Sequence, residues 1–162
     1  MNIFTVSFFG HRMIDRPFLI EQRLESLIRQ LINTKEYVDF IVGRSGDFDQ
    51  YASSAVLRVR KAVGDHNSSL TLVLPYPTAE YLNNQESFED YYSYIEISDA
   101  ASAAHRKAAY QIRNREMVDR SDLVVCCVER ESGGAWQTVK YALEQGKTVI
   151  NLANEDESVN LL

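Results

Sequence analysis

The chain has 162 residues, of which 45% are hydrophobic and 25% charged. This size and composition are typical of one globular domain. No stretch approaches the roughly 18–20 apolar residues that cross a bilayer, and the apolar run 3–9 is too short for a secretion signal. We therefore expect a cytoplasmic protein without membrane contact. The net charge of −6 and the pI near 5.1 argue against a nucleic-acid partner, because that affinity depends on many Lys/Arg–phosphate contacts.

Short apolar runs alternate with helical patterns along most of the chain. The helices are expected after Pro17, around the apolar stripe 52–63, and over 104–121 and 134–145, where apolar residues recur at helical spacing. The strands are predicted over Ile3–Phe9, Tyr37–Val42, Ser69–Leu74, Asp122–Val128 and Thr148–Leu152, with a further candidate at Tyr94–Ile97. Alternation of this kind predicts an α/β, Rossmann-like, three-layer domain with a mainly parallel sheet and helices on both faces.

Two segments depart from this alternation. The polar residues 154–162 are expected to form a frayed tail after a single domain at 1–153. The segment Thr78–Tyr94 is rich in Tyr, Asn and Glu. It is compatible with a lid or a partner surface, and equally with a solvated loop that contains one short helix.

Glycine follows three of the predicted strands, in Phe9–Arg12, Gly43–Asp49 and Glu131–Gly134. The first two turns also contain arginine. Carboxyl ends of parallel strands meet at one edge of a sheet, where ligands of such folds bind. Glycine lets backbone amides approach a phosphate, and a helix N-terminus attracts negative charge. The alternatives are structural: a loop with a surface cation in the first turn, a helix capped by Asp47 in the second, and a cap at Ser132 in the third. No Walker A or GxGxxG pattern and no metal-ligand spacing is present.

The helix at 104–121 has an unusual face. Tyr110, Arg113, Asn114 and Met117 share one side of it at helical spacing, so two polar residues interrupt a face that should be apolar. A partly buried arginine is costly without a partner. Either an acidic side chain, for which Asp49 and Glu131 are candidates, or a ligand satisfies Arg113.

Three segments together resemble a known superfamily. They are Phe9-Gly10-His11-Arg12, the run 113–118 (RNREMV) followed by Ser-Asp, and Ser132-Gly133-Gly134 followed by Thr138. The chain resembles the SLOG superfamily, which joins the DNA-processing DprA/Smf domain with the LOG cytokinin-activating enzymes. Within it, the chain is most similar to the short bacterial YpsA/YoqJ-like group, with its FTGHR and RNxxMVDxSD signatures. Phe9 replaces the threonine of the first signature. The resemblance implies a Rossmann-like fold that binds nucleotides or nucleotide-derived ligands.

The LOG branch cleaves the N-glycosidic bond of nucleoside monophosphates. Arg113 and Met117 match its Arg-Lys-x-x-Met motif, and Gly133 and Gly134 match the glycine pair of its second motif. The glutamate that ends this second motif falls on Lys140, and its Gly-Thr pair falls on residues 136–137 (WQ). A glycosidase usually needs a carboxylate at the reacting sugar. The resemblance therefore implies binding more strongly than catalysis, and leaves Arg113, Asp49 and Glu131 as catalytic candidates.

We therefore expect a binding or sensor domain for a mononucleotide, ADP-ribose or another NAD-derived ligand. Backbone amides after Ser132 would hold a phosphate, Arg12 and Arg113 would neutralise it, and Asp49 would accept hydrogen bonds from ribose. A LOG-type phosphoribohydrolase, a DprA-like nucleic-acid module and a protein-interaction module are the alternatives, and apolar helix faces are compatible with a homodimer. The predicted site comprises Gly10, His11, Arg12, Gly43, Arg44, Gly46, Asp49, Arg113, Asn114, Ser132, Gly133, Gly134 and Thr138.

Overall fold

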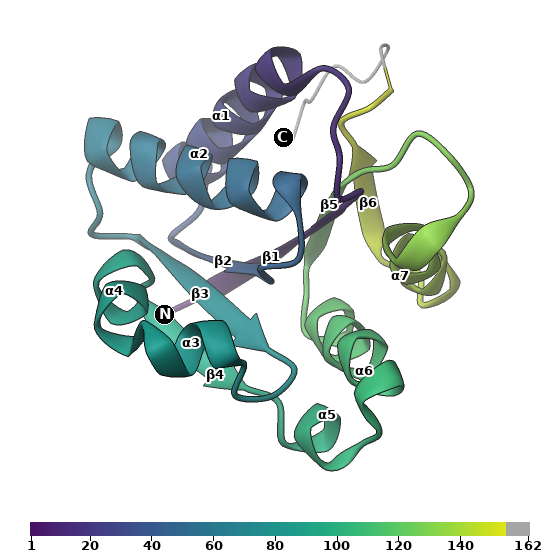
Figure 1. Cartoon of the computed structure of the whole chain (residues 1–162). Coiled ribbons are helices and arrows are strands. Elements are labelled where there is room, and N and C mark those ends of the chain that lie inside the picture. Colours follow the sequence, from purple (N-terminus) through teal and green to yellow (C-terminus); the bar gives the residue numbers. More distant parts are fainter. Residues whose placement is uncertain (155–162) are drawn as a thin grey trace.

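Six parallel strands form one sheet in the order β4-β3-β2-β1-β5-β6 (Figure 1). The computed structural model describes residues 1–154, so residues 155–162 of the predicted tail lie outside the described part. The strands are β1 (Ile3–Gly10), β2 (Tyr37–Val42), β3 (Ser68–Leu74), β4 (Tyr94–Ile97), β5 (Leu123–Cys127) and β6 (Thr148–Asn151). The helices are α1 (Pro17–Thr34), α2 (Asp47–Val63), α3 (Ala79–Asn83), α4 (Gln85–Tyr91), α5 (Asp99–Ala103), α6 (Arg106–Asp119) and α7 (Gly133–Glu144).

Helices cover both faces of the sheet, as the alternation of elements predicts. Neighbouring residues of a strand point to opposite faces. In β1, Phe8 belongs to the core cluster that contains the apolar stripes of α1 and α2, whereas Phe9 packs with Met117 and Val118 of α6. In Figure 1, α1 and α2 lie on one side of the sheet and α6 and α7 on the other. The three-layer Rossmann-like fold class is therefore confirmed, with every strand pairing parallel.

The Tyr-rich segment forms two short helices, α3 and α4, whereas the solvated-loop alternative predicted one. Thr78 caps α3, because its Oγ1 accepts a hydrogen bond from the Tyr81 backbone N–H. Phe88 and Tyr92, four residues apart, are both buried in the core. The short helix α5 was not predicted, because five residues are too few to show a helical period. At α6, His105 is the cap residue, and its Nδ1 accepts from the Lys107 N–H.

The strand order reverses beside β1. The chain proceeds from β1 through β2 and β3 to β4 on one side, then crosses to place β5 and β6 on the other side. Loops that leave the carboxyl ends of β1 and β5 therefore diverge and open a crevice, the usual binding position in open α/β sheets. Within residues 1–154, no helix is long and apolar enough to cross a membrane.

Candidate functional site

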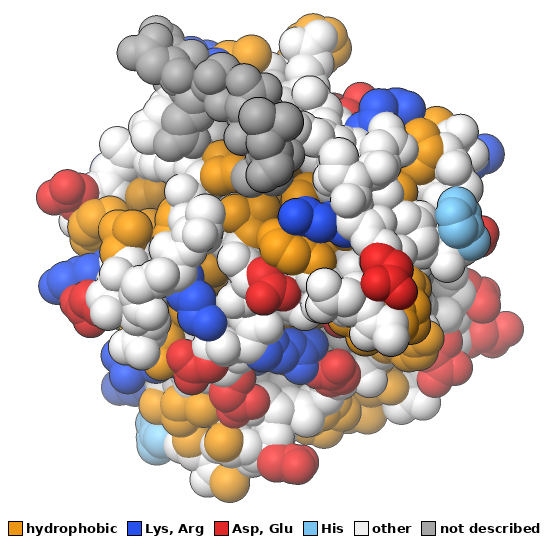
Figure 2. All heavy atoms as spheres, turned by 180° about the vertical axis from the view of Figure 1, so that it is seen from behind, with side chains coloured by type: hydrophobic (Ala, Val, Ile, Leu, Met, Phe, Trp, Pro, Cys, Tyr) orange, Lys and Arg blue, Asp and Glu red, His pale blue; other side chains and the backbone are white. Residues whose placement is uncertain are grey.

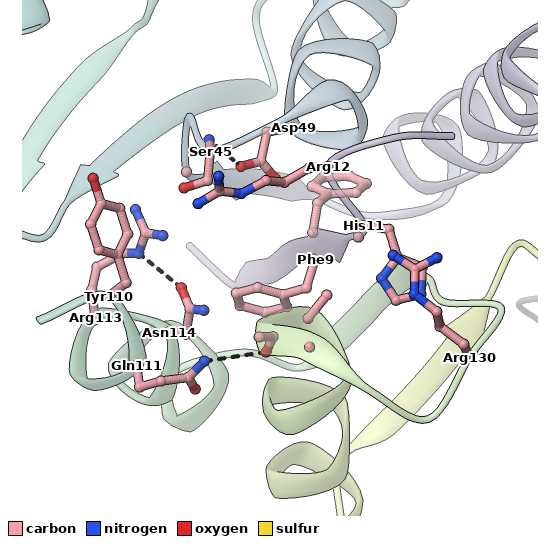
Figure 3. A pocket seen from close by; sticks show the side chains of 16 residues that line it. Phe9, His11, Arg12, Ser45, Asp49, Tyr110, Gln111, Arg113, Asn114 and Arg130 are labelled. Carbon is pink, nitrogen blue, oxygen red and sulfur yellow. Dashed lines mark hydrogen bonds between the residues drawn. The ribbon is translucent and has the colours of Figure 1, made fainter. Parts of the chain in front are cut away.

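A cavity of about 340 Å³ lies at the carboxyl ends of the strands beside this reversal. Its walls come from the loops after β1, β2 and β5, the first turn of α2, one face of α6 and the N-terminus of α7 (Figure 3). Nine of the thirteen predicted site residues line it, namely Gly10, His11, Arg12, Gly43, Asp49, Arg113, Asn114, Gly133 and Gly134. The turns predicted to meet at one sheet edge thus do meet there.

Two glycines of these loops are required by close packing of the protein itself. A Cβ on Gly10 would overlap the side chain of Phe48, a core residue of α2. A Cβ on Gly46 would lie 2.6 Å from the Arg12 Cα. The Asp47 N–H also donates to the Arg12 carbonyl at 2.9 Å. The loops after β1 and β2 are therefore locked together beside the cavity.

The N-terminus of α7 opens onto the cavity through Gly133, Gly134 and Ala135. Ser132 is the N-cap residue, but its side chain makes no capping hydrogen bond. Gly133 has φ of 88°, a left-handed conformation that favours glycine. The first amide N–H groups of a helix lack partners within the helix. This helix end therefore offers uncapped donors and a partial positive charge to a ligand.

Arg113 is buried at the centre of the site, with 4% of its surface exposed. Its Nη1 donates to the Val73 carbonyl and its Nε to Asn114 Oδ1, both at 2.9 Å. Asn114 Nδ2 in turn donates to Thr138 Oγ1 at 3.0 Å. Burial lowers the pKa of Arg113, although the nearby Asp49 opposes this shift. The side chain is thus held in one orientation by the strand β3 and by its own helix.

Asp49 is the one carboxylate among the described residues that line the cavity. Its Oδ2 accepts a hydrogen bond from the Ser45 backbone N–H at 2.8 Å. Burial raises the pKa of Asp49, and the Ser45 amide and the Arg113 charge only partly offset this effect. The structure therefore answers the question that the sequence left open about Arg113. Its direct partners are a backbone carbonyl and an amide, while Asp49 acts on it through charge.

His11 connects the loops after β1 and β5. Its side chain is buried, and its Nε2 accepts a hydrogen bond from the Glu129 backbone N–H at 3.2 Å. Burial lowers the pKa of His11, and the neighbouring charge of Arg130 lowers it further. The neutral imidazole therefore holds the start of the loop that leads to α7.

Four predicted site residues do not line the cavity. Arg44 turns away from it: Nε donates to Glu80 Oε1 at 2.8 Å and Nη1 to Tyr92 Oη at 2.9 Å. Gly46 packs against Arg12, Ser132 is exposed, and Thr138 is on the buried side of α7. Two further residues named in the sequence comparison with LOG enzymes, Glu131 and Lys140, are exposed outside the cavity.

Sequence reasoning missed several residues that line the cavity, chiefly Ser45, Tyr110, Gln111 and Arg130. Tyr110 carried a usable signal, since it lies one helical turn before Arg113 on the same face. Arg130 also carried a usable signal, since it is a basic residue shortly before the Gly133-Gly134 turn. Gln111 donates to the Gly134 carbonyl at 3.3 Å and so joins α6 to α7. Within the described residues, no three His, Cys, Asp or Glu side chains are grouped as a metal site would require.

Positively and negatively charged side chains lie at different positions along the cavity. Among residues 1–154, three arginines, Arg12, Arg113 and Arg130, and a single carboxylate, Asp49, line it. Figure 3 shows Arg113, Ser45 and Asp49 towards one end of the pocket, His11 and Arg130 towards the other, and Phe9 between them. Because the whole chain carries a net charge of −6, this excess of positive charge is a local property of the cavity.

Comparison with known proteins finds similarity at the level of structure only. No family model matches the chain, and no curated protein matches it. DNA processing protein A (DprA) from Streptococcus pneumoniae has a similar structure, with a TM-score of 0.65 and 18% identity, covering 91% of this chain and 49% of DprA. The molybdenum cofactor carrier protein from Chlamydomonas reinhardtii has a TM-score of 0.58 and 17% identity, covering 91% of this chain and 75% of the carrier. The chain thus spans about half the length of DprA and shares the Rossmann-like fold of both proteins.

Proposed function

We propose that the protein binds a small phosphate-bearing ligand, a nucleotide or nucleotide derivative, in the cavity beside β1 and β5. The observation that carries this proposal is the lining of three arginines and one buried carboxylate around the uncapped N-terminus of α7. Arg12 and Arg130 are exposed and have no ion-pair partner among residues 1–154. They are therefore free to meet an anion beside the amides of Gly133 and Gly134.

The size and composition of the cavity support a small molecule. A volume of about 340 Å³ falls within the range of small-molecule sites. The walls combine aromatic rings, Phe9 and Tyr110, with polar groups, which suits a ligand that has both a flat ring and charged substituents. One structural neighbour is named a carrier of the molybdenum cofactor, which supports small-ligand binding by this fold. The three sequence segments described above also support our placing the chain in the YpsA/YoqJ-like group.

The alternatives have less support. For a LOG-type hydrolase, the position of the motif glutamate is occupied by Lys140, and Glu131 lies outside the cavity. Asp49 remains the carboxylate that would act if the ligand is turned over. A nucleic-acid role is suggested by the name of DprA, but acidic and basic side chains are interspersed over the face seen in Figure 2. A duplex or long strand is better matched by a continuous basic surface.

A thermal-shift screen against AMP, ADP, ATP, NAD, ADP-ribose and cyclic nucleotides tests the proposal. A ligand at a hundredfold its Kd stabilises a protein by about 2.7 kcal/mol, which raises the Tm of a chain of this size by several degrees. Each hit is then incubated with the protein and analysed for released base, which separates binding from hydrolysis. The absence of a shift with every nucleotide, for a protein shown to be folded, would contradict the proposal.

Charge-matched variants locate the binding site. Arg12→Gln and Arg130→Gln each remove a cation that lines the cavity, whereas Arg29→Gln removes an exposed cation from α1. We expect the first two variants to weaken binding about tenfold, as loss of a charge-assisted hydrogen bond does, and Arg29→Gln to bind as the parent protein does. Equal binding by all three variants would place the ligand elsewhere.

A further inference from the structure

Three polar atoms that belong to the cavity walls lack hydrogen-bond partners among the described residues. Arg113 uses Nε and Nη1 for bonds inside the protein, which leaves Nη2 without a partner. Asp49 uses Oδ2 for the Ser45 amide, which leaves Oδ1. Ser45 Oγ is buried and unpaired. Of the three, Ser45 Oγ is a fully buried atom, and buried polar atoms without partners are rare in proteins and often mark the place of an absent ligand or water.

The chain itself brings these three atoms together. The guanidinium group of Arg113 lies against Gly43, where a Cβ would be 2.9 Å from Nη1 and 3.0 Å from Nη2. Ser45 follows two residues later, and its amide binds Asp49. The loop after β2 thus runs from the guanidinium group to the carboxylate with Ser45 between them, and Figure 3 shows all three side chains at one end of the pocket.

Arg113 and Asp49 do not neutralise each other directly, since they form no ion pair within residues 1–154. Each acts on the other only through charge. Both are more than nine-tenths buried, so an unmet donor faces the same cavity as an unmet acceptor. This end of the cavity is therefore shaped for a group that can accept from Arg113 and donate to Asp49.

The charges restrict the chemistry of that group. A phosphate would be repelled by the Asp49 carboxylate, and an ammonium group by the Arg113 guanidinium. A hydroxyl is neutral and both donates and accepts hydrogen bonds. Two adjacent hydroxyls can donate to Asp49 Oδ1 and accept from Arg113 Nη2 at once, while Ser45 Oγ pairs with either one. A vicinal diol satisfies all three atoms.

We propose that Asp49, Ser45 and Arg113 bind the 2′- and 3′-hydroxyls of a ribose, so that the cavity selects ribonucleotides over their deoxy counterparts. This inference rests on the proposed nucleotide function and assigns Arg113 to the sugar, whereas the sequence assigned it to the phosphate. The phosphate then lies with Arg130 and the amides of α7, while the Arg12 side chain reaches towards Ser45 and Asp49 (Figure 3). The 2′- and 3′-hydroxyls carry the selectivity, because a site built around a hydroxyl rejects the analogue that lacks it.

Calorimetric titration with AMP, 2′-deoxy-AMP and 3′-deoxy-AMP, and with the matching ADP series, tests the selectivity. We expect each deoxy analogue to bind at least about tenfold more weakly than its ribonucleotide, because a buried polar group loses its partner. If ribo and deoxy forms bind equally well, the diol inference is wrong and the proposed function stands. If neither series binds, the inference falls together with the nucleotide proposal.

Variants then assign the selectivity to these residues. Asp49→Asn retains an oxygen for the Ser45 amide but loses the carboxylate, and Asp47→Asn removes an exposed carboxylate from the same turn of α2. The readout is the ratio of ribonucleotide to deoxynucleotide affinity, which a general loss of folded protein does not change. We expect the ratio to fall towards one in Asp49→Asn and in Ser45→Ala, and to be preserved in Asp47→Asn. An unchanged ratio in both Asp49→Asn and Ser45→Ala would overturn the assignment.

Discussion

The guanidinium group of Arg113 lies flat against the backbone of Gly43, so closely that a Cβ at Gly43 would be 2.9 Å from Nη1 and 3.1 Å from Cζ. Arg113 cannot easily retreat, because its Nη1 is bound to the Val73 carbonyl and its Nε to Asn114. The glycine after β2 is therefore needed to admit the arginine of α6. A turn and a helix that are 70 positions apart in the sequence form one structural unit.

Gly43→Ala should destabilise the protein by about 1–3 kcal/mol, the usual cost of forcing extra atoms into a packed site. Chemical denaturation measures this loss. The same substitution in an Arg113→Ala background should cost less, because the side chain that it meets is gone, and the double-mutant cycle gives the coupling energy. Additive effects of the two substitutions would show that the contact does not limit stability.

Asp49→Asn should stabilise the ligand-free protein at neutral pH. Burial raises the pKa of Asp49 in the folded state above its ordinary value of 3.8. The stabilising contribution of such a group is fully present below the unfolded-state pKa and is lost as pH rises through the folded-state pKa. Asparagine stays neutral throughout. The advantage of the variant in free energy of unfolding should therefore shrink as the pH is lowered and Asp49 becomes protonated.

Denaturation curves at several pH values, recorded in parallel for Asp49→Asn and for Asp47→Asn, provide the measurement. Asp47 is exposed in the same turn, so it controls for a general change in net charge. A variant Asp49→Asn that is less stable than the parent protein at neutral pH would contradict this account of the buried carboxylate.

His11→Gln should reduce the sensitivity of the protein to mild acid. Burial, followed by the charge of Arg130, lowers the pKa of His11 below its ordinary value of 6.5. The unfolded chain therefore takes up a proton more readily than the folded protein, and stability falls as pH drops through 6.5 towards the folded-state pKa. Glutamine does not titrate, and its side-chain oxygen is an acceptor for the Glu129 N–H. The free energy of unfolding of both proteins is compared across this pH range, and parallel curves would contradict the prediction.

Arg44→Met should leave ligand affinity within about twofold, the size of effect expected for a side chain outside the site, although the sequence predicted Arg44 to bind the ligand. Its guanidinium group contacts Glu80, Tyr92 and the ring of Phe88, 4.8 Å away. Losing these contacts should loosen α3 and α4, which hydrogen exchange over residues 79–91 detects. A tenfold loss of affinity for any nucleotide hit, with exchange unchanged, would restore Arg44 to the binding site.

The fold class and the position of the site follow from the sequence, because the signals for them are local. Apolar residues of α1 recur at helical spacing, and β1, β2 and β3 are short apolar runs that end at glycine or proline. In a parallel sheet the turns after β1, β2 and β5 must share one edge. That geometry places Gly10, Gly43 and Gly133 on one edge of the sheet, and the strand order β2-β1-β5 then makes them neighbours.

Only the tertiary structure decides which side chains of these turns face the cavity. Arg44 turns away to meet Glu80, 36 residues later, while the adjacent Ser45 turns in. Arg113 is aligned by a carbonyl 40 residues before it. The direction of a side chain in an irregular loop depends on partners that are distant in the sequence. Such partners leave no periodic pattern in the local sequence from which the direction could be predicted. For the same reason the order of the strands, and with it the crevice between β1 and β5, is a property of the folded chain.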